Sequence, residues 1–236
     1  MAFRHLRDIL GEAGSLSVYA ACSLVGALVQ PSHQTQGEGT PVVLVPGFLG
    51  RGLAFLRLRQ ALIRAGYPVY IADLGYGVGC LEEKSRLLEK LIDHEGLDDY
   101  YLIGHSMGGL IAMGMSDEYR RRARHFITLG TTFRGAILSY LMPIFPAARQ
   151  LQPRSPVIQR LLQRVEEHDN ITSVVAAWDE IALPPRSCLV EGCEVRKTVP
   201  GHAQLILRSR AIEHLVELLE ELETGRVGKP DIPIVE

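Results

Sequence analysis

Several features that would point to other protein classes are missing from this sequence of 236 residues. It has no internal repeat, which argues against solenoids and propellers. Its 25 basic and 27 acidic residues nearly cancel, so charge gives no reason to expect nucleic acid as a partner. Only 6% of the residues are aromatic against 47% hydrophobic overall, so we expect one sizeable and mostly aliphatic core.

The four cysteines form no C-x-x-C pair, so a zinc ribbon or thioredoxin-like site is not expected, and no metal site is predicted. Cys188 and Cys193 are close enough to be bridged across a turn, but free thiols are favoured because nothing indicates an oxidising compartment. The basic residues Arg120–Arg122 and Arg124 are interpreted as cations at a helix C-terminus. Contact with phosphate or a membrane is the alternative.

A long hydrophobic run is also missing. The longest one, residues 16–29, is shorter than the roughly 20 residues of a membrane span. Asp8 and Glu12 precede it, which suits a signal peptide poorly. We therefore predict an N-terminal helix packed on the domain, with peripheral membrane contact through residues 16–29 as the alternative. A cytoplasmic or membrane-associated protein is favoured over a secreted one.

After a linker rich in Pro, Ser, Gln and Gly, short apolar segments alternate with helical patterns. This alternation predicts an α/β domain with a mostly parallel sheet that is covered by helices on both faces. The predicted strands are residues 42–45, 69–72, 100–103, 126–129, 171–176 and 194–199. The predicted helices are residues 53–65, 81–94, 107–119 and 204–222. Residues 131–169 hold four prolines and an apolar stretch, and we interpret them as a cap over the active site.

Gly104-His105-Ser106-Met107-Gly108 fits the pattern G-x-S-x-G between a predicted strand and a predicted helix. In that context the chain turns sharply and exposes the serine hydroxyl at the carboxyl edge of the sheet. The flanking glycines remove side chains that would clash in the turn. Ser106 is therefore the predicted nucleophile.

Three stretches resemble the bacterial lipases and carboxylesterases of the α/β-hydrolase superfamily: residues 42–50, 104–109 and 129–135. Two departures stand out, since Pro46 replaces a common His and Thr132-Phe133 replace a common Pro-His. The resemblance implies an α/β-hydrolase fold over residues 41–224 with its cap insertion. Residues 1–40 are then an N-terminal helical segment and linker, and residues 225–236 a loose tail.

The base and the acid of the predicted site follow from the chain order Ser, then Asp or Glu, then His, which this resemblance implies. His202 follows a predicted strand and Pro200-Gly201, as the family's base does; His125, His168 and His214 are placed less suitably. Asp179 follows the strand at residues 171–176, with Glu180 as the alternative acid. Asp169 precedes that strand and would lie at the wrong edge of the sheet.

The expected oxyanion hole consists of the backbone N–H groups of Met107 and, by resemblance, Phe48. Phe48, Leu138 and Leu141 are the expected contacts of an apolar acyl chain. The run Gly75-Tyr76-Gly77-Val78-Gly79 looks like a dinucleotide fingerprint, but Cys80 stands where its third glycine would be. We expect no cofactor, and interpret this run as a loop beside the active site.

These observations predict hydrolysis of carboxylic esters with apolar acyl chains, that is, ester or lipid-like substrates. An acyltransferase or a thioesterase that uses the same residues is the first alternative. A non-catalytic binding protein on this fold is the second, and fold alone does not decide among the three.

Overall fold

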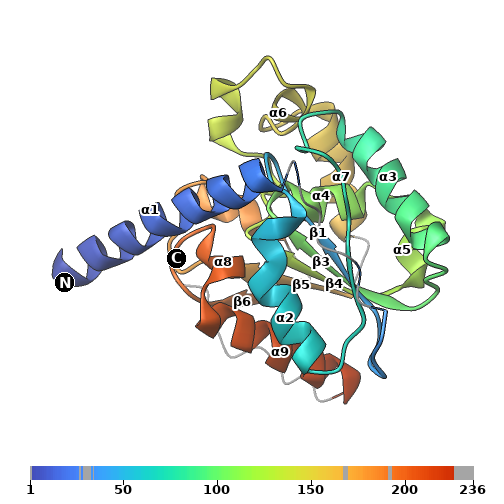
Figure 1. Cartoon of the computed structure of the whole chain (residues 1–236). Helices are drawn as coiled ribbons and strands as arrows, with labels where there is room; N and C mark the ends of the chain where they lie inside the picture. The colour runs from blue at the N-terminus through green and yellow to red at the C-terminus, as the bar shows by residue number, and fades with distance from the viewer. Residues whose placement is uncertain are drawn as a thin grey trace.

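A computed structural model of the protein describes residues 2–26, 28, 33, 35–166, 170–190 and 193–225. Its centre is a six-stranded sheet in the order β2-β1-β3-β4-β5-β6, and all neighbouring strands are parallel (Figure 1). The strands are β1 (Val42–Val45), β2 (Val69–Ile71), β3 (Tyr100–His105), β4 (Ala123–Leu129), β5 (Ile171–Val175) and β6 (Glu194–Lys197). The predicted strands and the parallel α/β class are thus confirmed.

Helices cover both faces of the sheet (Figure 1). The α-helices are α1 (Ala2–Val25), α2 (Leu56–Arg64), α3 (Leu81–His94), α4 (Met107–Met113), α5 (Asp117–Arg122), α6 (Pro146–Gln150), α7 (Pro156–Glu166), α8 (Gln204–Leu207) and α9 (Ser209–Glu223). The 3-10 helices are η1 (Gly52–Phe55), η2 (Ile137–Leu141) and η3 (Pro185–Cys188). Side chains of α3, α4 and α7 share one core cluster, and those of α2, α8 and α9 share the other.

Strand β1 shows why the predicted strands read as unbroken apolar runs. Val43 and Val45 point into the cluster of α3, α4 and α7, whereas Val42 and Leu44 point into the opposite cluster. All four side chains are fully buried. A strand covered on both faces therefore has no polar side.

Two helices that the sequence predicts as continuous are broken. The helix predicted at residues 107–119 is divided into α4 and α5, because Ser116 has an extended backbone with ψ of 160°. The helix predicted at residues 204–222 is divided into α8 and α9 by Arg208, which is extended with ψ of 131°. The second break matters for the site, because α8 directly follows the turn that carries His202.

Helix α1 starts earlier than the hydrophobic run predicts, at Ala2, and ends at Val25. One side of it packs on the cluster of α2, α8 and α9 through Leu16, Tyr19 and Cys22. Its other side leaves Val18 and Leu24 exposed. Among the described residues, no helix is both long enough and apolar enough to cross a bilayer.

The segment after β4 is only partly a cap. Helices η2 and α6 stand above the carboxyl edge of the sheet, whereas α7 lies against the sheet (Figure 1). Ile158, Leu161 and Val165 of α7 are buried in the core. The expected cap of residues 131–169 is therefore too long at its C-terminal end, because α7 is the helix that connects β4 to β5.

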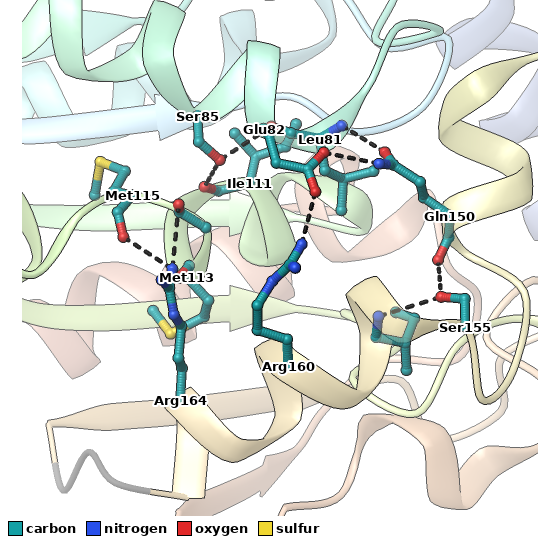
Figure 2. A network of polar contacts seen from close by, with 12 residues as sticks. Leu81, Glu82, Ser85, Ile111, Met113, Met115, Gln150, Ser155, Arg160 and Arg164 are labelled. Carbon is teal, nitrogen blue, oxygen red and sulfur yellow. Dashed lines mark hydrogen bonds and ion pairs between the residues drawn. The ribbon is translucent and has the colours of Figure 1, made fainter.

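A network of polar contacts joins the cap to the helices below it (Figure 2). Gln150, the last residue of α6, accepts a 2.7 Å hydrogen bond from the Leu81 N–H and donates a 2.7 Å bond to Glu82. Arg160 of α7 forms an ion pair with the same Glu82 at 2.7 Å. Since Leu81 begins α3, Gln150 satisfies an N–H group that the helix itself leaves unpaired.

The remaining expectations concern smaller features. Cys188 is a buried free thiol, as the sequence favours over a bridge to Cys193. Burial raises the pKa of this thiol to about 12. Arg120–Arg122 do form the last turn of α5, as expected. Arg120 is itself buried and pairs with Asp117 at 2.5 Å. The expected loose tail lies outside the described residues from residue 226 onward.

Candidate active site

Ser106 occupies a strained turn between β3 and α4. Its φ of 55° and ψ of −124° lie in a region that non-glycine residues rarely adopt. The Ser106 N–H donates to Leu129 O at 2.8 Å, and the Thr131 hydroxyl donates to Ser106 O at 2.8 Å. The end of β4 thus holds the strained residue in place.

The glycines on either side of Ser106 are required by close backbone contacts. A Cβ atom on Gly104 would lie 2.5 Å from the Gly109 nitrogen. A Cβ atom on Gly108 would overlap the carbonyl oxygen of Val45 in β1. The helix after Ser106 can therefore approach β1 only because these positions have no side chain, as the motif predicts.

Asp179 and His202 come from the loops after β5 and β6, and the structure brings them together. His202 Nδ1 and Asp179 Oδ2 are 2.9 Å apart, and both side chains are buried. The other carboxylate oxygen accepts hydrogen bonds from the N–H groups of Ile181 at 2.9 Å and Ala182 at 2.7 Å. The carboxylate is thereby fixed in one orientation.

Competing effects act on the pKa of Asp179. Burial raises this pKa. The hydrogen bond and the charge of His202, together with the two backbone N–H groups, lower it by more, so the net pKa is below its ordinary value. Asp179 is therefore a carboxylate at neutral pH. It favours the His202 tautomer with the proton on Nδ1, which leaves Nε2 free to act as a base.

His105, the residue before Ser106, is a part of the site that the sequence did not single out. Its ring centroid is 4.8 Å from that of His202, and its Nε2 is 3.2 Å from His202 O. Burial, then repulsion from His202, lowers the pKa of His105 to about 3, so its ring is neutral. Its place in the x position of G-x-S-x-G is the only signal that the sequence offers.

The loop after β1 lies directly against the nucleophile turn. A Cβ atom on Gly47 would lie 2.9 Å from Ser106 Cβ and 3.2 Å from the Met107 nitrogen. Phe48 follows, is half-buried, and packs edge-on against Phe145 of the cap at 5.7 Å. The two expected oxyanion donors, Phe48 and Met107, thus belong to segments in close contact.

The glycine-rich run at residues 75–79 borders the same loop. Tyr76 O accepts a 2.8 Å hydrogen bond from the Leu49 N–H. A Cβ atom on Gly77 would lie 2.9 Å from Gly47 O and 3.0 Å from the Met107 Sδ-methyl carbon. This run is therefore a wall beside the candidate active site, in keeping with the loop interpretation.

The alternative site residues are placed elsewhere. Glu180 does not bond His202, His125 bonds Thr172 at 2.9 Å, and His214 lies in α9 near Thr198. His168 and Asp169 lie outside the described residues. Within the part of the chain that the structure describes, no group of three or more His, Cys, Asp or Glu side chains is arranged to hold a metal ion.

The expected acyl contacts differ in exposure. Leu138 is half-buried, whereas Leu141 is 76% exposed. Both belong to η2, together with the exposed Ile137. The structure therefore places Leu138 and Leu141 in the cap itself, and Phe48 in the loop after β1, where its ring packs on Phe145 of the cap.

Comparison with known proteins agrees with this geometry. A sequence profile of the alpha/beta hydrolase fold matches residues 40–187. The chain belongs to the α/β-hydrolase family. Haloalkane dehalogenase 2 of Mycobacterium tuberculosis is 27% identical over 213 residues, which are 84% of this α/β hydrolase and 71% of its relative. Human 1-acylglycerol-3-phosphate O-acyltransferase is 32% identical over 108 residues, which cover 41% of this chain and 30% of that protein.

Solved structures share the fold of this α/β hydrolase. An α/β hydrolase from the sediment metagenome of the Mar Chica lagoon has a TM-score of 0.63 at 19% identity, over 83% of this chain and 94% of its own. A carboxylesterase of the thaumarchaeon Nitrososphaera gargenis has a TM-score of 0.64 at 14% identity, over 83% and 95%. These likenesses show a shared fold, and the family match supports a hydrolase.

Proposed function

We propose that this protein hydrolyses carboxylic esters through an acyl-enzyme on Ser106. Ser106 Oγ attacks the carbonyl carbon while His202 Nε2 takes the hydroxyl proton. The backbone N–H groups of Phe48 and Met107 bind the oxyanion of the tetrahedral intermediate, and one such donor contributes about 3 kcal/mol. The carbon–oxygen bond to the leaving alcohol then breaks, and the alcohol takes its proton from His202.

Water completes the cycle with the same two kinds of proton transfer. His202 takes a proton from water as the oxygen attacks the acyl carbon, and returns a proton to Ser106 as the carboxylic acid leaves. Asp179 stays ionised and stabilises the imidazolium that forms in both halves. No step requires a cofactor.

One observation carries this proposal: the buried 2.9 Å contact between Asp179 and His202 at the sheet edge where Ser106 adopts its strained conformation. A hydroxyl nucleophile also suits acyl transfer better than the dehalogenation that the relative's name indicates. Displacement of a halide by Ser106 would form an alkyl ether, which water and a general base do not cleave. An acyl ester on the same oxygen is hydrolysed readily, so only acyl chemistry gives turnover.

The proposed substrates carry an apolar acyl chain. Ile137, Leu141 and Ile144 of the cap are all more than half exposed, and Phe145 packs on Phe48 of the oxyanion loop. An acyl chain that leaves the site toward the cap would cover these side chains, and each buried CH₂ group contributes about 0.8 kcal/mol. We therefore infer an esterase or lipase-like enzyme of lipid-like substrates.

Acyl transfer to an acceptor other than water is the second candidate, favoured by the local similarity to a 1-acylglycerol-3-phosphate O-acyltransferase. Thioester cleavage uses the same steps with a thiol as leaving group. Product analysis with competing alcohols and with thioester substrates separates these activities from hydrolysis. A binding protein without catalysis would give no turnover in any of these assays.

A fluorophosphonate probe tests the mechanism directly. We expect the probe to add to Ser106, and Ser106→Ala to abolish both labelling and turnover of p-nitrophenyl esters. Ser116→Ala, which changes an exposed serine at the start of α5, is the matched control and should behave as the unmodified enzyme. Covalent labelling of any other residue would refute the proposed mechanism.

A further inference from the structure

Helix α1 contacts each of the loops that form the candidate site. The Tyr19 ring lies 5.8 Å from the His105 ring, and its hydroxyl fills the space in which a side chain on Gly50 would lie. Further toward the N-terminus, Glu12 is only 2% exposed and its Oε1 accepts a 2.8 Å hydrogen bond from the Ala203 N–H. Ala203 directly follows His202. A residue far away in the sequence therefore binds the backbone of the turn that carries the histidine.

The turn is shaped to receive this carboxyl group. Gly201 has φ of 95°, and a Cβ atom there would overlap Glu12 Oε2. The side-chain amide of Gln204 borders the same position with its Nε2. Arg208 fixes this amide by donating a 2.7 Å hydrogen bond to Gln204 Oε1. The polar groups of the turn and of α8 thus surround one end of Glu12.

The other end of Glu12 faces the loop of the candidate acid. Burial, followed by hydrogen bonding and repulsion from Glu180, raises the pKa of Glu12 to about 8. Glu12 is therefore a neutral acid at pH 7. Its Oε1 accepts from the Ala203 N–H, and the Glu180 and Gln204 side chains lie near the same carboxyl group. Among the described residues, Glu12 Oε2, both Glu180 carboxylate oxygens and Gln204 Nε2 are buried without a hydrogen bond of normal geometry.

We propose that Glu12 is a positioning residue that holds the Gly201–Ala203 turn through the Ala203 N–H and so keeps His202 against Asp179. This inference rests on the proposed function, in which His202 is the base. Glu12 touches no reacting atom. It acts by limiting the movement of the imidazole, because displacement of a catalytic group by about 1 Å lowers the rate by roughly a hundredfold.

The test compares three changes at this position with a control on the same helix. Glu12→Ala removes the acceptor of the Ala203 N–H, whereas Glu12→Gln keeps that acceptor. Glu12→Asp is one carbon shorter and gives the same test as Glu12→Ala where the alanine variant does not fold. Ser23→Ala removes the hydroxyl of another buried polar residue of α1 and serves as the control. The measurements are kcat and KM for a p-nitrophenyl ester and hydrogen exchange of the Ala203 amide.

We expect Glu12→Ala to lower kcat roughly ten- to a hundredfold with KM within about twofold, and to speed exchange of the Ala203 amide. Glu12→Gln should restore kcat to within about threefold of the unmodified enzyme, and Ser23→Ala should match it. Unchanged kcat in both Glu12→Ala and Glu12→Asp would overturn the proposal. So would an equal loss in Glu12→Ala and Glu12→Gln, because the kept acceptor would then have no value.

Amide exchange separates this proposal from the proposed function. Exchange at Ala203 depends on Glu12 whether or not Ser106 is the nucleophile. If the fluorophosphonate probe labelled another residue while Glu12→Ala still freed the Ala203 amide, the mechanism would fail and the structural tie would stand. If the probe labelled Ser106 while the amide and kcat were unchanged in Glu12→Ala, only the positioning role would fail.

Discussion

The two segments that border the candidate active site, helix α1 and the cap, contact it in opposite ways. α1 buries a carboxyl group and an aromatic ring against the backbone turns that carry Ser106 and His202. The cap is held through its backbone and through Gln150, which bonds Leu81 and Glu82 of α3 (Figure 2). It leaves the apolar side chains of Ile137, Leu141 and Ile144 exposed. We infer that α1 controls the geometry of catalysis and the cap controls the choice of substrate.

The largest expected effect sets the scale for this comparison. Asp179→Asn should lower kcat by about 10⁴-fold while the fold is kept, because an amide at this position favours the wrong tautomer of His202. Steady-state kinetics and circular dichroism check the two parts. Glu180→Gln is the matched control at the neighbouring position and should change kcat only mildly. A large loss in Glu180→Gln with a mild one in Asp179→Asn would identify Glu180 as the acid.

Deletion of residues 1–30 is the next largest change and tests whether α1 belongs to the domain. Leu16 and Tyr19 would lose their packing. Full burial of a large side chain contributes about 1.5–3 kcal/mol and these two are half-buried, so a loss of roughly 2–3 kcal/mol should lower Tm by about 5–10 °C. We also expect lower kcat in the soluble fraction, because Glu12 is removed. Differential scanning fluorimetry and kinetics measure both.

A membrane role for the exposed side of α1 predicts a different result from the same deletion. The truncated protein would then be more soluble, equally stable, and no longer found with membranes on fractionation. Replacing Val18 and Leu24 with serine separates the two, because these side chains are 50% and 70% exposed and face away from the packed side. That double variant should keep Tm and kcat if α1 acts only on the domain.

The part of the site that the sequence predicts is the part that local pattern encodes. Ser106, Asp179 and His202 each follow a strand of a parallel sheet. The strand pattern, with the chain order that the family resemblance implies, therefore places them at one edge. The strands were equally predictable from their apolar runs. The break at Arg208 was not predictable, because the apolar spacing continues across it in α8 and α9 and only the backbone changes direction.

Glu12 shows what local pattern cannot provide. It lies 191 residues before Ala203, and a single glutamate in a helix resembles any solvated surface charge. Only the packing of α1 on the His202 turn gives it a partner and removes it from water. The same holds for α7. The prolines before it suggested a cap, but its Ile158 and Leu161 are buried in the core that it shares with α3 and α4.

A smaller effect is expected from the cap. Replacing Leu138 and Leu141 with serine should flatten the preference for medium acyl chains over acetate, by up to about fourfold for each CH₂ group that loses contact. A panel of p-nitrophenyl esters of increasing chain length measures this preference. Val18→Ser, an equivalent change on the exposed side of α1, should leave it unaltered. A strict preference for acetate in the unmodified enzyme would contradict the role of the cap.

The last expected effect is a pH dependence of stability that arises from Glu12. Its pKa is 4.5 in an ordinary setting and about 8 in the folded protein, so the folded state holds a proton that the unfolded chain releases. This contribution is fully present below pH 4.5 and is lost as pH rises through 8.

The groups that face Glu12 are the Glu180 carboxylate, the His202 turn through the Ala203 N–H, and the Gln204 amide held by Arg208. Between pH 5 and 8.5, Glu12→Gln should remove this loss, so that its Tm falls less with rising pH than that of the unmodified protein. Glu180→Gln should have the same sign, since it removes the repulsion that raises the pKa, whereas Ser23→Ala should keep the original slope. Equal slopes in all four proteins would show that α1 does not hold a proton beside the Asp179–Glu180 loop, and would reduce the contrast between α1 and the cap to one of packing alone.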